Sequence, residues 1–369
     1  MKHSKNVFVI GCGVSGLSCA LLLHNKGWNV TIITKEHPEQ VSKNPEFASL
    51  IPAASIIPHT LSSDISEELF AGSKAYFKKL HEQGFPGVKI DEHYELFGHY
   101  RDVPHYATQM DHFESFSTFK KGFYPHHPDI EILTGWKFDC YFADWSQYFP
   151  ALLEEVKKSG IDIIVQKLNR DDLTALPSEI IVNCTEIGAI ELFNDPHAII
   201  YRGHILKIPG APTLTNPEGK RVSYNFSPGG DIFQSESGFQ QDVYCYSRSD
   251  GWVWGGSRQR GILSDSGSWD IEDNKGETHS IDGHDVPVEI SQLNKEIIEH
   301  SFGINTAEFE PVSTKMGYRY VRKNQNGLRL EKEKLGDKLI IHNYGHGGAG
   351  VTLSWGCAEK MVEMLNVEF

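Results

Sequence analysis

The chain contains no uninterrupted apolar run of about 18 residues, the length from which a membrane-spanning helix is built. It is also short of basic residues, since 35 Lys and Arg stand against 49 Asp and Glu, a formal net charge of -14 at pH 7. Nucleic acid and anionic membranes attract basic surfaces, so this balance argues against both as partners. We expect a soluble protein.

Disulfide and metal motifs are missing as well. The six cysteines have no CxxC spacing, and Cys12 lies inside a glycine-rich turn. His342, His346 and the pair His126-His127 lack the spacing that would bring a third ligand to a metal ion. We therefore expect reduced, packed thiols in a cytoplasmic protein, with no metal site.

Glycines first gather near the N-terminus, between a short apolar strand and a helix. Residues 7–10 are followed by Gly11-x-Gly13-x-x-Gly16 and then by a helical run over 17–26. In a dinucleotide-binding turn the first glycine permits a sharp exit from the strand, the second lets the pyrophosphate lie against the backbone, and the third lets the helix pack on the sheet. The free N–H groups of the helix N-terminus then favour an anion.

The residues after this helix support the same interpretation. A second strand is expected over 29–34, and an acid at its end would bind the ribose hydroxyls, for which Glu36 is the better candidate. Lys35 could instead face a phosphate. A signal peptide over 1–23 is the alternative, but three glycines interrupt its apolar run and a strand pattern follows at once.

A second glycine cluster directly follows the short apolar strand 338–341. Gly345, Gly347, Gly348 and Gly350 occupy four of six consecutive positions. Without side chains, such a backbone can approach a flat or charged ligand and aim several N–H groups at one point. This pattern is typical of a cofactor site.

Between the two clusters the hydrophobic spacing predicts alternating helices and strands. Helices are expected over 64–83, despite Gly72 on the apolar face, and over 144–158. Strands are expected over 161–165 and 179–185, and the polar stretch 264–287 is expected to be a surface loop.

The length of 369 residues allows two cores, and the order of these elements indicates two interleaved domains. We predict an α/β fold in which a Rossmann-type dinucleotide-binding domain is interleaved with an α+β substrate domain built on a mixed or antiparallel sheet. The predicted boundaries are 1–84, 145–200 and 310–369 for the dinucleotide-binding domain, and 85–144 and 201–309 for the substrate-binding domain.

Several segments together resemble one known family, the FAD-dependent D-amino-acid oxidases. The strongest similarity is HNYGHGGAGVTLSWGCA, residues 342–358, which matches that family's signature almost letter for letter. The other matching segments are 47–55, 181–185, 202–207 and 317–322, with 329–331 after the last of these.

The resemblance implies that FAD lies extended, with its pyrophosphate on the first glycine turn. Leu168 would contact the adenine through its backbone, and Cys184 and Thr185 would complete the wall of the FAD site. The C-terminal glycine turn would direct N–H groups at the flavin ring. The full set of expected cofactor-binding residues is Gly11, Gly13, Val14, Ser15, Gly16, Lys35, Glu36, Ser49, Ala53, Ala54, Ser55, Leu168, Cys184, Thr185, Gly347, Gly348, Ala349, Gly350, Val351 and Thr352.

For the substrate, the resemblance implies that Arg319 grips a carboxylate with two parallel hydrogen bonds. Tyr244 would join it there, with Tyr246 as the alternative, and Gly348 would line the substrate. No protein acid or base is required, because a neutral amine can transfer hydride from Cα to the flavin. Molecular oxygen would then be reduced to hydrogen peroxide, and family members are often homodimers.

This chain departs from the family pattern at three positions. Glu186 stands where the family usually has glycine, Ala349 where an aromatic is frequent, and Tyr320 where a proline usually follows the substrate arginine. The lid loop falls near 238–240, where no second substrate tyrosine is evident. Two alternatives therefore stay open: an oxidase or dehydrogenase of another amine, such as glycine, sarcosine or a specialised biosynthetic amino acid, and a flavin-binding protein without turnover.

Overall fold

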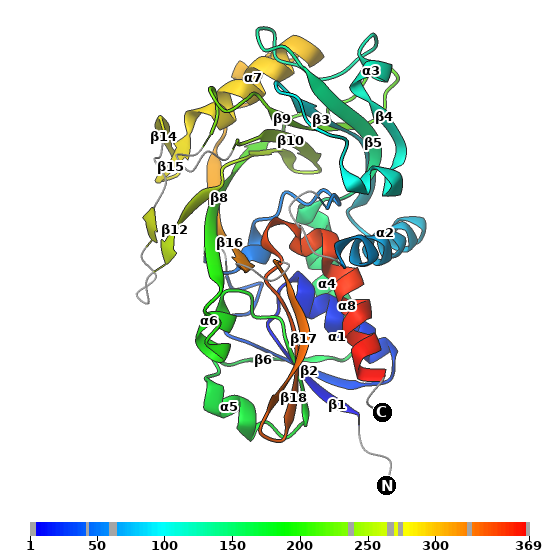
Figure 1. The fold of residues 1–369 in the computed structure, drawn as a ribbon, viewed down its shortest axis with the longest axis vertical. Helices are drawn as coiled ribbons and strands as arrows, with labels where there is room; N and C mark the ends of the chain where they lie inside the picture. Colours follow the sequence, from blue (N-terminus) through cyan, green and yellow to red (C-terminus); the bar gives the residue numbers. More distant parts are fainter. Residues whose placement is uncertain are drawn as a thin grey trace. The chain divides into compact units, whose positions relative to one another are not determined.

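The computed structural model describes residues 5–41, 44–58, 65–234, 240–263, 269–271, 276–322 and 327–366. The chain divides into two compact units, each assembled from segments far apart in the sequence, as the colours of Figure 1 show. Unit 1 comprises Met1–Val88, Gln147–Ile199 and Arg319–Phe369, and unit 2 comprises Lys89–Ser146 and Ile200–Tyr318.

A sheet with the strand order β17-β18-β7-β1-β2-β6 lies at the centre of unit 1. Neighbouring strands from β18 to β6 run parallel, and only the edge strand β17 pairs antiparallel, with β18. Its central strand β7 is buried along its whole length and apolar at three of four positions, as expected where both faces of a parallel sheet are covered. The strands are β1 (Asn6–Ile10), β2 (Asn29–Thr34), β6 (Asp162–Val165), β7 (Ile180–Asn183), β17 (Arg329–Leu335) and β18 (Lys338–Tyr344).

Helices α1 (Val14–Asn25), α2 (Ser66–Glu82) and α8 (Gly350–Asn366) pack against one another in unit 1. At the crossing of α2 and α8, a methyl group on Gly356 would lie 1.9 Å from the carbonyl oxygen of Leu69. Gly72 faces the Cα of Gly356 there, so the glycine that lowers the helix propensity of α2 permits a close helix crossing. The other helical segments in unit 1, wholly or in part, are η1 (Ala48–Leu50), α4 (Trp145–Lys158), α5 (Arg170–Ala175), α6 (Gly188–Phe193) and η4 (Gly347–Ala349).

Unit 2 is built on a mixed sheet with the strand order β13-β12-β8-β11-β10-β9-β3-β5-β4, and β16 also pairs with β8. Strands β3 and β9 run parallel, whereas β9, β10, β11 and β8 pair antiparallel in turn. The strands are β3 (Val88–Phe97), β4 (Asp111–Ser115), β5 (Thr134–Ala143), β8 (Ala198–Pro209), β9 (Val222–Ser227), β10 (Val243–Arg248), β11 (Gly251–Gly255), β12 (Gln259–Leu263), β13 (Trp269–Ile271) and β16 (Ser313–Arg322). The expected fold class is confirmed.

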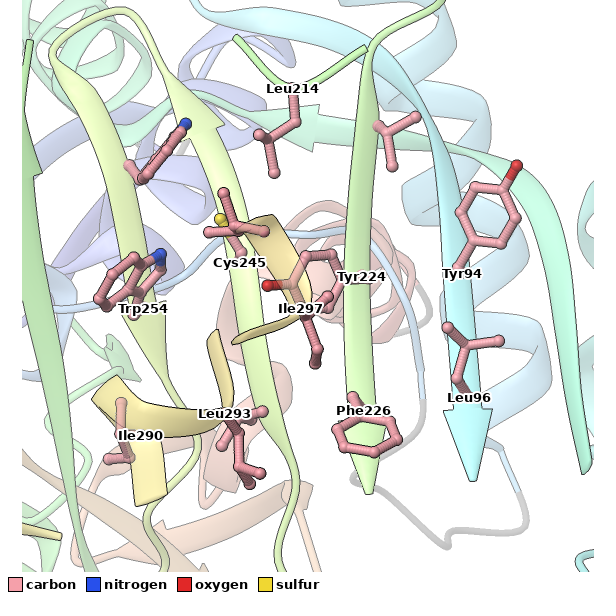
Figure 2. Packing of buried hydrophobic residues seen from close by; sticks show 14 of the residues in the cluster. Tyr94, Leu96, Leu214, Tyr224, Phe226, Cys245, Trp254, Ile290, Leu293 and Ile297 are labelled. Carbon is pink, nitrogen blue, oxygen red and sulfur yellow. The ribbon is translucent and has the colours of Figure 1, made fainter. Parts of the chain in front are cut away.

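The core of unit 2 lies between this sheet and helix α7 (Val288–Phe302), which packs on β10 and β11. Ile290, Leu293 and Ile297 belong to one buried cluster with residues of the sheet that include Tyr224 and Trp254 (Figure 2). Each such aliphatic side chain contributes about 1.5–3 kcal/mol when it is buried. The remaining helical segments of this unit are η2 (His105–Gln109), α3 (Phe116–Phe119) and η3 (Thr306–Glu308).

The expectation of a surface loop over 264–287 is wrong for its described part. Strands β14 (Thr278–Ile281) and β15 (His284–Pro287) form an antiparallel hairpin. Its turn is Asp282-Gly283, with φ of 51° and 78°, and an Asp-Gly pair is a strong hairpin signal in a sequence. Residues 264–268 and 272–275, like Asp64 at the expected start of α2, lie outside the described residues.

Candidate functional site

Two glycines of the first glycine turn have no room for a side chain, Gly11 beside the residue that follows β7 and Gly16 within the turn itself. A methyl group on Gly11 would lie 2.4 Å from the carbonyl oxygen of Cys184, and φ at Gly11 is 107°. A methyl group on Gly16 would lie 2.0 Å from the carbonyl oxygen of Gly11. The turn is thus pressed against the adjacent parallel strand, with the N-terminus of α1 directly after it.

The start of α1 carries no acidic residue and no side-chain cap at Gly13. The hydroxyl of Ser49 accepts a hydrogen bond from the N–H of Val14 at 2.9 Å, and Ser15 follows within the buried first turn. A helix N-terminus without an acidic residue favours an anion. The structure therefore places Ser49, expected to line the flavin, beside the turn expected to hold the diphosphate.

Lys35 and Glu36, the two candidates at the end of β2, differ in their surroundings. Lys35 is exposed, and its Nζ lies 3.2 Å from Oε2 of Glu46. Glu36 is half-buried, and its Oε2 accepts a hydrogen bond from Nδ2 of Asn44 at 2.5 Å. A fixed, half-buried carboxylate suits the recognition of hydroxyl groups better than a solvated ammonium does.

The segment that contains Ala53, Ala54 and Ser55 lies against the start of α8. The hydroxyl of Thr352 donates hydrogen bonds to the carbonyl oxygens of Ser55, at 3.2 Å, and Ile57, at 3.3 Å. Ala54 is buried with a φ of 79°, a conformation that residues with a Cβ rarely adopt. Through Ser49 and Thr352, one loop therefore contacts the first turns of both α1 and α8.

The residues after β7 link the two glycine turns. The N–H of Cys184 donates to the carbonyl oxygen of Ile10 at 2.8 Å, and both the N–H and the hydroxyl of Thr185 donate to Oδ1 of Asn183. A hydrogen bond to Cys19, together with burial, raises the pKa of the Cys184 thiol well above its ordinary value. All six cysteines are free and buried, so the expected packed thiols are confirmed.

The second glycine turn leads directly into the long helix α8. Gly345 and Gly347 have φ of 83° and 57°, and the N–H of Ala349 donates to the carbonyl oxygen of His346 at 3.0 Å. Gly348 is exposed, whereas Ala349 is fully buried. The methyl group of Ala349, which stands where the family often has an aromatic residue, therefore packs in the interior of unit 1. The first turn of α8, with Gly350 and Val351, contains no acidic residue and presents main-chain N–H groups.

Leu168 follows β6 and is buried in the core cluster that also contains Ile10 and Ile33. It lies in unit 1 with all the other residues expected to bind the cofactor. The structure therefore gathers the expected cofactor residues in the unit that carries the parallel sheet.

Tyr320, another departure from the family, belongs to a buried network centred on Asp195. Oδ2 of Asp195 accepts hydrogen bonds from Tyr320 Oη at 2.6 Å, Tyr344 Oη at 2.7 Å and Arg322 Nε at 2.8 Å. Burial alone would raise the pKa of Asp195, but these donors and the N–H of His197 lower it to about 2. The network joins the end of β16 to β18, the strand that precedes the second glycine turn.

The two candidate substrate residues fall in different units. Arg319 is half-buried in β16, where it begins the last segment of unit 1. Tyr244 is buried in β10 of unit 2, and a methyl group on its cross-strand neighbour Gly255 would lie 2.2 Å from the Tyr244 hydroxyl oxygen. The hydroxyl of Tyr246 donates to Oδ1 of Asn225 at 2.7 Å, so its polar end already has a protein partner.

Three expectations concern regions outside these contacts. Residues 238 and 239 of the expected lid loop lie outside the described residues. Within the described ranges, no three His, Cys, Asp or Glu side chains are arranged to hold a metal ion, and no helix is long and apolar enough to cross a membrane. A cavity of about 780 Å³ in unit 2 is lined by residues between 100 and 136, none of which is among the expected site residues.

An open, mostly parallel sheet with glycine turns after β1 and β18 defines a dinucleotide-binding protein of the Rossmann class. A family model described as DAO, FAD dependent oxidoreductase, matches residues 6–364. The chain therefore belongs to this family of FAD-dependent oxidoreductases, and both the expected family and its cofactor are confirmed.

Known relatives are similar to the chain over nearly its whole length. A D-amino-acid oxidase of Rubrobacter xylanophilus is 27% identical over 355 residues, covering 95% of this chain and 93% of the relative. A D-amino-acid oxidase of Dictyostelium discoideum is 27% identical, covering 98% and 91%. The crystal structure of a glycine oxidase from Bacillus cereus shares the fold with a TM-score of 0.62 at 15% identity, covering 99% and 96%.

The residues of unit 1 fit FAD on structural grounds. The Gly11–Gly16 turn offers a bare backbone and a helix N-terminus without acidic residues to a diphosphate, and Glu36 offers a fixed carboxylate to a ribose. The start of α8 offers main-chain N–H groups beside an exposed glycine. Main-chain N–H donors suit the diphosphate and the flavin ring of FAD, and a carboxylate acceptor suits its ribose hydroxyls.

Proposed function

We propose that this protein is an oxidase of D-amino acids that uses FAD and releases hydrogen peroxide. The observation that carries the proposal is the convergence of both glycine turns and the 47–57 loop in unit 1, joined by the Val14–Ser49 and Thr352–Ser55 hydrogen bonds. Family membership and the relatives named D-amino-acid oxidase support it. The six buried free thiols are in keeping with a cytoplasmic enzyme.

On the cofactor side, the main chain of Gly11–Gly16 holds the diphosphate and Glu36 binds the ribose. Leu168 contacts the adenine through its backbone, and Cys184 and Thr185 complete the wall of the FAD site. The N–H groups of Gly347–Thr352 lie at the positive end of the α8 dipole. Donors fixed in this way stabilise negative charge that develops on a bound ring without having to reorganise.

On the substrate side, Arg319 holds the carboxylate of the amino acid through two parallel hydrogen bonds, and the Tyr244 hydroxyl joins it. A planar guanidinium fixes the orientation of a carboxylate as well as its position. Gly348, which is exposed and has no side chain, leaves room for the substrate beside the turn. Anchoring the acid group in this way fixes the direction in which the single Cα–H bond of the amino acid points.

FAD, when bound, would supply the acceptor for the hydride that leaves Cα and the two electrons that reduce oxygen to hydrogen peroxide. The lone pair of the neutral amine forms the C=N bond as the hydride departs, so no protein base is required at Cα. Water hydrolyses the released imino acid to a 2-oxo acid and ammonia. The contribution of Arg319 and Tyr244 is therefore one of binding and orientation.

The test is peroxide production by the FAD-loaded protein with neutral, acidic and basic D-amino acids, each beside its L-enantiomer. We expect peroxide with D-enantiomers only, and a loss of at least about a hundredfold in kcat/KM for Arg319→Ala, since each charged hydrogen bond contributes about 1.5–3 kcal/mol. Turnover of glycine or sarcosine with no D-amino acid active would instead favour an oxidase of another amine. The absence of peroxide with every amine tested would refute the proposal.

A further inference from the structure

Glu186 adopts a backbone conformation that a residue with a side chain rarely takes. Its φ is 47°, in the left-handed region, and it stands where the resembled family usually has glycine. Glycine adopts this conformation without steric conflict, whereas any residue with a Cβ does not. Interactions made by the Glu186 side chain must therefore offset the strain.

The carboxylate of Glu186 binds two consecutive residues of the second glycine turn. Its Oε2 accepts a hydrogen bond from the N–H of Gly345 at 3.0 Å, and its Oε1 accepts one from Nδ1 of His346 at 2.5 Å. The His346 side chain is 1% exposed and that of Glu186 26%. Charge-assisted hydrogen bonds of this kind are stronger than neutral ones, particularly where one partner is buried.

The second ring nitrogen of His346 also faces an acceptor. Nε2 lies 2.9 Å from Oδ1 of Asn343, and Nδ2 of Asn343 donates to the sulfur of Cys19, which fixes the orientation of the amide. Each ring nitrogen of His346 therefore has a protein partner, Oε1 of Glu186 for Nδ1 and Oδ1 of Asn343 for Nε2, so the ring is held on both sides.

The other ionisable groups that face this pair do not compete for it. Cys357 is a buried thiol whose pKa is raised well above its ordinary value by burial, and the Glu186 charge adds to the effect. Arg322 packs beside Gly345, but its Nε is bound to Asp195. Glu186 is thus the carboxylate that hydrogen-bonds to His346.

His346 transmits this arrangement to the start of α8. Its carbonyl oxygen accepts the N–H of Ala349 within η4, and Gly350 then begins the helix. We propose that Glu186 is a positioning residue for the flavin: by hydrogen-bonding to Nδ1 of His346 and to the N–H of Gly345, it sets the main-chain N–H groups of 347–350. This inference rests on FAD binding by unit 1 and not on the identity of the amine.

The test compares Glu186→Gly, Glu186→Gln and the wild type in two measurements that need no turnover. The first is the FAD dissociation constant, from fluorescence titration of the apoprotein. The second is ¹⁵N NMR of labelled histidine side chains, with His346 assigned by its loss in His346→Asn. The matched control is Asp282→Gly, which relieves a φ of 51° at an exposed turn of unit 2.

We expect Glu186→Gly to weaken FAD binding at least about tenfold although it relieves the backbone, and Asp282→Gly to leave it unchanged. Glu186→Gln can accept from Gly345 and still pair with Nδ1 of His346, so it should stay within about threefold of the wild type, with the His346 resonances shifted because the carboxylate beside Nδ1 has been replaced. The inference is overturned if the His346 resonances are unchanged in Glu186→Gln, or if Glu186→Gly binds FAD normally. Should Glu186→Gly fail to fold, the Gln variant and the NMR signal decide.

These outcomes are independent of substrate. A wild type that binds FAD more tightly than Glu186→Gly, yet oxidises no D-amino acid, would refute the proposed function and leave the role of Glu186 standing.

Discussion

Replacing Asp195 by Asn should destabilise unit 1 strongly, because it leaves a buried guanidinium without its charge partner. The Arg322 side chain is 6% exposed and that of Asp195 1%, with 2.8 Å between Nε and Oδ2. An amide can accept on one side only, so it cannot satisfy Tyr320, Tyr344 and Arg322 on one oxygen and the N–H of His197 on the other. Breaking a buried pair in this way costs about 3–5 kcal/mol.

The same group predicts a pH dependence. The pKa of Asp195 is lowered from 3.8 to about 2, which corresponds to about 2 kcal/mol of stability. Because the folded-state pKa lies below the unfolded-state value, this contribution is complete above about pH 4 and is lost as the pH falls towards 2. The wild type should therefore lose it over that range, whereas Asp195→Asn should not.

Urea unfolding followed by circular dichroism at several pH values measures both effects. The matched control is Asp337→Asn, since Asp337 is 74% exposed and pairs with Lys338 at 3.5 Å, a surface pair worth at most about 1 kcal/mol. Equal free energies of unfolding for the two variants at pH 7 would refute the assignment of Asp195 as a buried anchor.

The other predictions concern the cofactor and substrate residues. Arg319→Lys should recover only a small part of the kcat/KM lost in Arg319→Ala, because an ammonium cannot make the bidentate contact; full recovery in a peroxide assay would contradict that contact. Gly255→Ala should lower kcat/KM about tenfold and leave the FAD affinity unchanged, because its methyl group would lie 2.2 Å from the Tyr244 hydroxyl oxygen. Unchanged kinetics would show that Tyr244 has no part in the reaction. Glu36→Ala should weaken FAD binding about tenfold, the value of one charged hydrogen bond, whereas Lys35→Ala should change it less than about twofold; the reverse order in a fluorescence titration would assign the ribose contact to Lys35.

Local patterns were sufficient to predict the cofactor half of the fold. Strand, glycine turn and helix follow one another over 7–26, and the short distances at Gly11 and Gly16 agree with the close backbone packing expected of these two glycines. Each strand expected in unit 1 is present, from the buried apolar run of β7 to the mostly exposed edge strand β6.

Contacts between distant residues could not be predicted in the same way. Glu186 and His346 are 160 positions apart, and Asp195 and Tyr320 are 125 apart, so no spacing rule connects them. Both pairs involve a residue that departs from the family pattern, and the structure shows what each departing side chain binds. The β14–β15 hairpin is a different case, because its Asp282-Gly283 turn is a recognisable signal within a polar segment.

The most direct test of the account is the absorbance of the FAD-loaded protein, mixed without oxygen with a D-amino acid or with its L-enantiomer. We predict a flavin spectrum that the D-enantiomer bleaches and the L-enantiomer leaves intact, with recovery when air is admitted. A protein that takes up no FAD, or a flavin band that no D-amino acid bleaches, would contradict the central claim.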